Sequence, residues 1–152
     1  MANKFFPVSI DLNDKNILVI GAGKISLRKI ETLLKYNCNI TVITKEVLEE
    51  KFFDLEKDDK IKILKYQEFE EKFLENIFLV IAATDDEVLN KNISQLCMSK
   101  NILVNNITSK DDMSVRFASI YEKDDIQIAI SANGNPKKAV EIKHKIKDIF
   151  EK

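Results

Sequence analysis

Two of the chain's three glycines, Gly21 and Gly23, directly follow a run of four apolar residues. The first glycine allows a sharp turn at the end of a strand, and the second lets the backbone approach a bound anion because it has no Cβ. A helix that begins after the turn directs free N–H groups and the positive end of its dipole toward the same anion. The pattern predicts the pyrophosphate site of a dinucleotide. The residues expected to form it are Gly21, Ala22, Gly23, Lys24 and Ile25.

The residues after the next apolar run bear on the choice of dinucleotide. Thr44, Lys45 and Glu46 follow this run. An acidic residue at the end of the second strand binds the ribose hydroxyls of NAD in dinucleotide-binding folds. Thr44 and Glu46 are candidates for the ribose, whereas Lys45 would tolerate the 2′-phosphate of NADP. We therefore predict NAD and leave NADP open.

A later apolar run ends in small residues, which would leave room for the ribose and nicotinamide to pass over a sheet. Ala83, Thr84 and Asp85 follow this run and are predicted cofactor contacts. Thr84 is also predicted to cap the helix that follows, with Glu87 as its capping-box partner three residues on.

Polar residues follow a further predicted strand. Asn105 belongs at the carboxyl end of that strand, which is the ligand side of a parallel sheet, and is a predicted cofactor contact. Asp111 and Asp112 are the only carboxylates in the adjoining loop for acid–base chemistry, although solvated loop acids are the simpler interpretation. His144, the only histidine, lies among lysines and is interpreted as a surface residue.

Strands and helices that alternate would position these residues. The predicted strands are 17–20, 40–43, 61–64, 78–83, 102–104 and 126–131, and the predicted helices are 24–36, 47–55, 69–74, 85–99 and 137–150. Residues 105–117 are polar and turn-like. The alternation predicts an α/β fold of the Rossmann type, with a doubly wound, mostly parallel sheet and helices on both faces. We expect residues 1–152 to form a single dinucleotide-binding domain.

Composition excludes several classes of protein. The 24 basic and 25 acidic side chains nearly cancel, which argues against nucleic acid or an anionic membrane as a partner. No apolar run approaches the ~20 residues of a membrane span, and we expect a soluble cytoplasmic protein. Cys38 and Cys97 are isolated, so we expect buried, inert thiols and no metal site.

With these residues assembled, the chain resembles the precorrin-2 dehydrogenase / sirohydrochlorin ferrochelatase family, the dehydrogenase domain of siroheme synthase. The resemblance covers nearly the whole chain, and its most specific motifs are the glycine turn continued to Arg28-Lys29 and the run Ala82–Asp86. It implies NAD-dependent oxidation of a tetrapyrrole, precorrin-2, to sirohydrochlorin. It also implies a homodimer at full length and, in some members, insertion of ferrous iron.

The chain departs from the family pattern at positions that matter for chemistry. The resemblance places the family's acid–base aspartate at Thr108, which cannot act as a carboxylate base. Either Asp111 or Asp112 takes that role, or the chemistry is weakened or lost. Residues from about 112 to 152 lead into the family's dimerisation region, which we expect to be absent or truncated. The alternative interpretation is a non-catalytic module that binds a dinucleotide or a tetrapyrrole.

Overall fold

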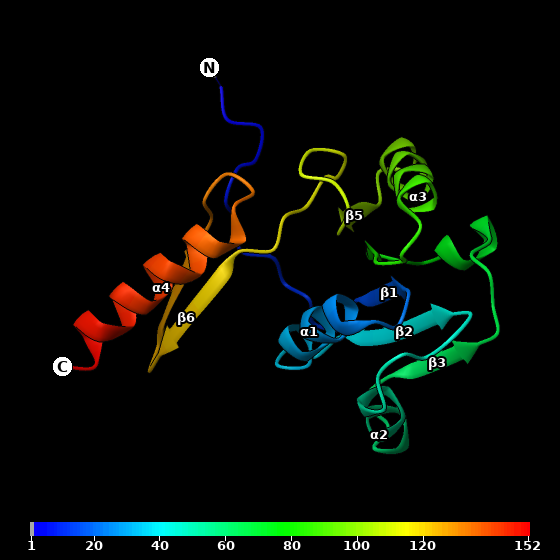
Figure 1. The fold of residues 1–152 in the computed structure, drawn as a ribbon, viewed down its shortest axis with the longest axis horizontal. Helices are drawn as coiled ribbons and strands as arrows, with labels where there is room; N and C mark the ends of the chain where they lie inside the picture. Colours follow the sequence, from blue (N-terminus) through cyan, green and yellow to red (C-terminus); the bar gives the residue numbers. More distant parts are fainter. Residues whose placement is uncertain (1) are drawn as a thin grey trace. The chain divides into compact units, whose positions relative to one another are not determined.

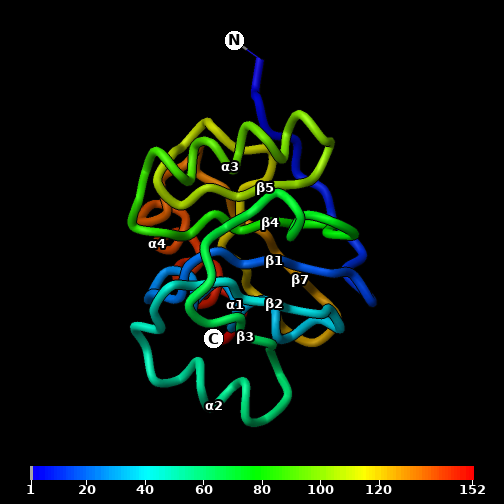
Figure 2. The backbone as a smooth tube through the Cα atoms, turned by 90° about the vertical axis from the view of Figure 1, so that its right-hand side faces the viewer, coloured from blue at the N-terminus to red at the C-terminus, as the bar shows by residue number. Residues whose placement is uncertain are grey.

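The computed structural model describes residues 2–152, which form two compact units that divide between Val115 and Arg116 (Figure 1). The first unit contains a five-stranded parallel sheet with the strand order β3-β2-β1-β4-β5, which Figure 2 shows from one side. Its strands are β1 (Asn16–Ile20), β2 (Asn39–Thr44), β3 (Lys62–Lys65), β4 (Leu79–Ala82) and β5 (Leu103–Asn106). The predicted α/β fold of the Rossmann type is confirmed.

Both faces of the central strands are covered. Every residue of β4 is buried, and neighbouring side chains of a strand point to opposite faces. On one face, Ile93 and Cys97 of α3 (Glu87–Ser99) join the apolar core that contains Val80. The right-handed crossovers of parallel strands place α1 (Lys24–Leu33) and α2 (Lys51–Lys57) on the other face, because the chain leaves β1 and β4 in opposite directions.

Three helices of this unit begin or end inside their predicted ranges. α3 begins at Glu87 rather than at residue 85. α1 ends at Leu33, although the sequence predicted a helix to residue 36. α2 begins at Lys51 rather than at residue 47. In the segment before it, the Leu48 N–H donates to the Ala22 carbonyl of the glycine turn at 3.0 Å. The helix predicted over residues 69–74 is a single 3₁₀ turn, η1 (Glu71–Leu74).

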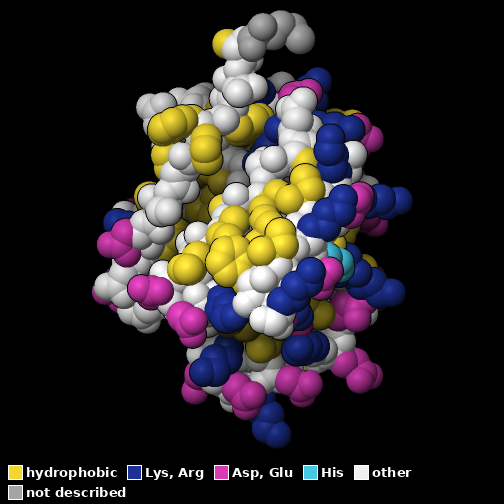
Figure 3. All heavy atoms as spheres, turned by 90° about the vertical axis from the view of Figure 1, so that its left-hand side faces the viewer, with side chains coloured by type: hydrophobic (Ala, Val, Ile, Leu, Met, Phe, Trp, Pro, Cys, Tyr) yellow, Lys and Arg dark blue, Asp and Glu magenta, His cyan; other side chains and the backbone are white. Residues whose placement is uncertain are grey.

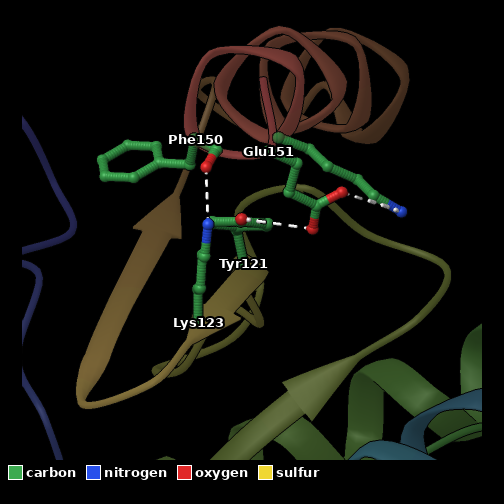
Figure 4. A network of polar contacts seen from close by, with 5 residues as sticks. Tyr121, Lys123, Phe150 and Glu151 are labelled. Carbon is green, nitrogen blue, oxygen red and sulfur yellow. Dashed lines mark hydrogen bonds and ion pairs between the residues drawn. The ribbon is translucent and has the colours of Figure 1, made fainter.

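The second unit is a hairpin with one helix. β6 (Ser119–Lys123) pairs antiparallel with β7 (Ile126–Ile130), and α4 (Pro136–Phe150) follows. The sequence did not predict β6. The strand predicted at 126–131 pairs with β6 in this separate hairpin and not with the parallel sheet. Figure 4 shows how the end of α4 is fixed to β6. The Tyr121 hydroxyl bonds Glu151 Oε1 at 3.3 Å, and Lys123 Nζ donates to the Phe150 carbonyl at 2.5 Å.

Large apolar side chains are exposed on the second unit, at Ile126, Val140, Ile149 and Phe150. Figure 3 shows hydrophobic side chains gathered on the face that it presents. Across residues 2–152, no helix is both long enough and apolar enough to cross a membrane.

The cysteines and the histidine occupy different environments. Cys97 is fully buried, and this burial raises the pKa of its thiol to about 11. Cys38 is only half-buried, so the expectation of a buried thiol is wrong for this residue. His144 is exposed on α4, as the sequence predicted.

Candidate cofactor site and adjoining cavity

Gly21 occupies a position that no other residue fits. Its φ of +107° lies in a region that favours glycine, and a Cβ would be 2.2 Å from the Ala83 carbonyl oxygen. Its N–H donates to the Ile43 carbonyl at 2.9 Å. These contacts bring together the ends of β1, β2 and β4, which carry three of the predicted cofactor segments.

Gly23 is different, because the protein leaves space where its side chain would be. A Cβ there would meet only Leu48 Cδ1, at 3.9 Å. α1 begins at this glycine with no side-chain cap and no acidic residue in its first turn. By contrast, Asp86 caps α3 and Asn135 caps α4. An open backbone and an uncapped helix N-terminus fit a pyrophosphate group.

The other residues of the turn lie as such a site requires. Ala22 is buried, whereas Lys24 and Ile25 are exposed at the start of α1. Ser26 is 1% exposed, and its hydroxyl donates to the Gly21 carbonyl at 2.7 Å. This bond closes the turn at the position where a third glycine is common.

The predicted ribose residues differ in how free their side chains are. Thr44 is buried, and its hydroxyl both donates to the Glu46 carbonyl and accepts from the Glu46 N–H, so it shapes the turn after β2. Glu46 is exposed. Lys45 pairs with Glu68 at 2.9 Å, and this contact is the main cause that raises the pKa of Lys45, with smaller contributions from Asp86 and Asp85. Sequence reasoning missed Glu68, because only the fold brings it to β2.

The end of β4 corrects one prediction. Thr84 does not cap α3; the cap is Asp86, whose carboxylate accepts from the Leu89 N–H at 3.1 Å. Ala83 is buried against Gly21, and Asp85 is exposed. The Thr84 hydroxyl instead donates to Asn90 Oδ1 at 2.6 Å.

Asn90 connects the ends of two strands. It is 0% exposed, and its amide nitrogen donates to the Thr84 carbonyl at 3.0 Å and to the Thr108 hydroxyl at 3.2 Å. Asn90 was not among the residues predicted to form the site. The signal that was available is its place as an asparagine within the apolar face of a predicted helix.

The side chain of Asn105 lies beneath the surface of the site. It is 4% exposed, and its amide nitrogen donates to the Val115 carbonyl at 2.9 Å. Its Oδ1 is buried and has no hydrogen-bond partner among the described residues. The expected contact of Asn105 with a cofactor therefore has one available acceptor.

A cavity of about 210 Å³ adjoins the end of β5. It is lined by Glu87, Lys91, Asn106, Thr108, Ser109 and Asp112. Asp112 has one carboxylate oxygen, Oδ2, that is buried without a partner in the described structure. Asp111 is exposed and lies outside this lining, and its backbone carbonyl accepts a hydrogen bond from Lys4. Of the two predicted carboxylates, the structure places only Asp112 beside Thr108 at the cavity.

A family model described as putative NAD(P)-binding matches residues 8–119. The chain belongs to this family. It is 39% identical over 130 residues to a siroheme synthase of Mannheimia succiniciproducens and 40% identical over 130 residues to one of Buchnera aphidicola. These alignments cover 86% of the chain but only 27% of each relative.

A solved structure gives the same family assignment. The fold matches "SirC, precorrin-2 dehydrogenase" with a TM-score of 0.82 and 26% sequence identity, over 95% of this chain and 70% of that one. Together with the siroheme synthases, this match confirms the family resemblance found in the sequence.

Proposed function

We propose that the chain oxidises precorrin-2 to sirohydrochlorin with NAD as the hydride acceptor. The observation that carries the proposal is the space at Gly23 beside the uncapped start of α1, where the protein itself gives no reason for a glycine. The siroheme synthase relatives and the precorrin-2 dehydrogenase neighbour support the choice of substrate.

Each predicted segment has a task in this proposal. The backbone from Gly21 to Ile25 binds the pyrophosphate, and the turn Thr44–Glu46 borders the adenine-side ribose. Ala83–Asp85 and Asn105 border the nicotinamide half, since β4 and β5 follow β1 on that side of the sheet. A nicotinamide held there would supply hydride acceptance, and the polar loop after β5 would receive the accompanying proton.

The test is an anaerobic assay of the purified chain with precorrin-2 and NAD, followed by the absorbance of NADH and of sirohydrochlorin. We expect both products in equal amounts. Gly23→Asp should abolish turnover and NADH binding, because a carboxylate would occupy and repel the pyrophosphate position. NADH binding without any turnover would contradict the proposal and favour the non-catalytic module.

Two further properties are separate proposals. We expect a homodimer at full length, supported by the apolar side chains exposed on the second unit, and light scattering tests this. Insertion of ferrous iron into sirohydrochlorin needs its own anaerobic assay, because its result is independent of the oxidation.

A further inference from the structure

Tyr66, the first residue after β3, has an unusual backbone and an unusually exposed ring. Its side chain is 86% exposed, whereas Tyr36 is half-buried and Tyr121 is buried. Its φ is +58°, in the left-handed region that strains a residue with a bulky side chain. Within residues 2–152, six other non-glycine residues have a positive φ, and all are aspartate or asparagine: Asp14, Asp59, Asn76, Asn101, Asp124 and Asn133.

The fold itself gives no reason for a tyrosine at this position. Aspartate and asparagine tolerate a positive φ because their short polar side chains bond the local backbone. A tyrosine ring stabilises a fold by being buried, and the ring of Tyr66 is not. Strained residues that persist in a protein cluster at ligand sites. The exposed ring therefore indicates a place where a flat apolar group binds.

The segment that follows Tyr66 contacts the predicted ribose turn. β3 pairs parallel with β2, so both strands end at the same edge of the sheet. The Gln67 N–H donates to the Thr44 carbonyl at 3.2 Å. Glu68, the next residue, pairs with Lys45 at 2.9 Å. Tyr66 is thus fixed beside the turn after β2 by both residues that follow it.

The strand order indicates which part of a dinucleotide would reach Tyr66. On this side the sheet runs β1, β2, β3 outward (Figure 2). The proposed pyrophosphate position is at the end of β1, and the proposed ribose position is at the turn after β2. The end of β3 lies one strand further, about 10 Å from β1 at the usual strand spacing. The group that follows the ribose in this direction is the adenine base.

We propose that Tyr66 binds the adenine of the dinucleotide by stacking its ring against the base. The inference rests on the proposed use of NAD and adds a contact that the predicted residues do not include. Both faces of a purine are flat π surfaces, which stack on exposed aromatic side chains. Tyr66 is a binding residue in this proposal and takes no part in the transfer of hydride.

The test measures the affinity for ADP-ribose, which contains the adenine and the pyrophosphate but no nicotinamide, by isothermal titration calorimetry. Tyr66→Asn removes the ring and should bind ADP-ribose about tenfold more weakly, within the range of base–aromatic stacking. Tyr66→Phe keeps the ring and should stay within about twofold of the wild type. Phe6→Ala removes another highly exposed ring, in the segment before β1, and should leave the affinity unchanged.

Two further measurements separate a contact with the base from a structural role. Asparagine tolerates a positive φ, so Tyr66→Asn should unfold at the same urea concentration as the wild type or at a higher one. A loss of stability together with affinity would show that the ring supports the fold, and would overturn the inference. The chain has three tyrosines and no tryptophan. ADP-ribose should therefore lower the tyrosine emission of the wild type and leave that of Tyr66→Phe nearly unchanged.

The remaining outcomes distinguish this inference from the proposed function. If the wild type oxidises precorrin-2 and Tyr66→Asn binds ADP-ribose as tightly as the wild type, the inference is wrong while the proposed function stands. If the wild type binds ADP-ribose without any turnover, the proposed function fails, and the affinity of Tyr66→Asn still decides the adenine contact. If the wild type binds neither ADP-ribose nor NADH, both proposals fall.

Discussion

Gly21 and Gly23 lie two residues apart but are constrained for different reasons, and alanine at each position separates them. Gly21→Ala places a Cβ against the Ala83 carbonyl at a positive φ. We expect it to lower the free energy of unfolding by about 2–5 kcal/mol, from strain and overpacking together. Gly23→Ala should cost less than about 1 kcal/mol but weaken NADH binding about tenfold or more. Urea unfolding and NADH fluorescence measure the two effects.

The opposite pattern would contradict this division of roles. A Gly21→Ala variant as stable as the wild type would show that the turn can move away from Ala83. A Gly23→Ala variant with unchanged NADH affinity would show that the space beside Leu48 is not where the pyrophosphate lies.

Asn90 is fully buried, and its side chain hydrogen-bonds residues that follow two different strands. Asn90→Ala removes the amide group that accepts from the Thr84 N–H and hydroxyl and donates to the Thr84 carbonyl and the Thr108 hydroxyl. The backbone N–H and carbonyl of Thr84 lose these bonds. We expect the free energy of unfolding to fall by about 2–4 kcal/mol. Asn92→Ala, on the exposed side of the same helix, is the matched control and should change it by less than about 0.5 kcal/mol. Equal effects of the two substitutions would rule out the connecting role of Asn90.

At the scale of elements, the start of α3 offers a matched pair of acids. Asp86→Ala removes the cap on the Leu89 N–H and should cost about 0.5–2 kcal/mol in thermal unfolding. Asp85→Ala removes an exposed carboxylate that is not the cap and should cost less than about 0.5 kcal/mol. A larger loss of stability in Asp85→Ala than in Asp86→Ala would contradict the assignment of Asp86 as the cap of α3.

The contact between the segments after β2 and β3 bears on cofactor choice. Glu68 neutralises Lys45, so Glu68→Gln leaves a cation beside the predicted ribose position. We expect NADPH to gain about two- to fivefold in affinity relative to NADH at low salt, a modest effect because solvent weakens the pairing of exposed charges. Glu70→Gln breaks the similarly exposed pair with Lys72 and should leave the ratio unchanged. If Glu68→Gln leaves the ratio of NADPH to NADH affinity unchanged, Lys45 does not lie at the ribose site.

Elements whose signal is local could be predicted from the sequence. Four apolar residues in a row predicted β1, because a strand buried on both faces needs apolar side chains throughout. Gly21 and Gly23 predicted the turn, because glycine readily adopts a positive φ and leaves room for a ligand. β6 could not be predicted, since Ser119–Lys123 has few apolar residues and pairs across a turn without glycine. The positions of Glu68 beside Lys45 and of Asn90 between Thr84 and Thr108 depend on contacts between segments that are distant in the sequence. The same holds for the cavity that Asp112 lines and Asp111 does not. The spacing of residues along the chain does not encode such contacts.

At the scale of the whole molecule, the second unit has its own pH dependence. Burial is the main cause that raises the pKa of Tyr121, and Glu151 and Asp124 add to it. Because the pKa is higher in the folded state than in the unfolded state, this stabilisation is full below pH ~10 and is lost as the pH rises through the folded pKa.

We therefore expect the wild type to lose stability between pH 9 and about 11.5 more steeply than Tyr121→Phe, measured by urea unfolding followed by circular dichroism. Tyr66→Phe is the control, because Tyr66 is 86% exposed and its removal should leave the slope unchanged. Equal slopes in the wild type and Tyr121→Phe would contradict the effect.

The bond from Asn105 to the Val115 carbonyl has a mechanical consequence. Val115 is the last residue of the first unit, and its N–H also donates to the Val104 carbonyl at 3.0 Å. The chain is thus anchored to β5 immediately before it continues into the second unit. The strand that holds this last residue of the first unit ends in Asn106, which lines the cavity.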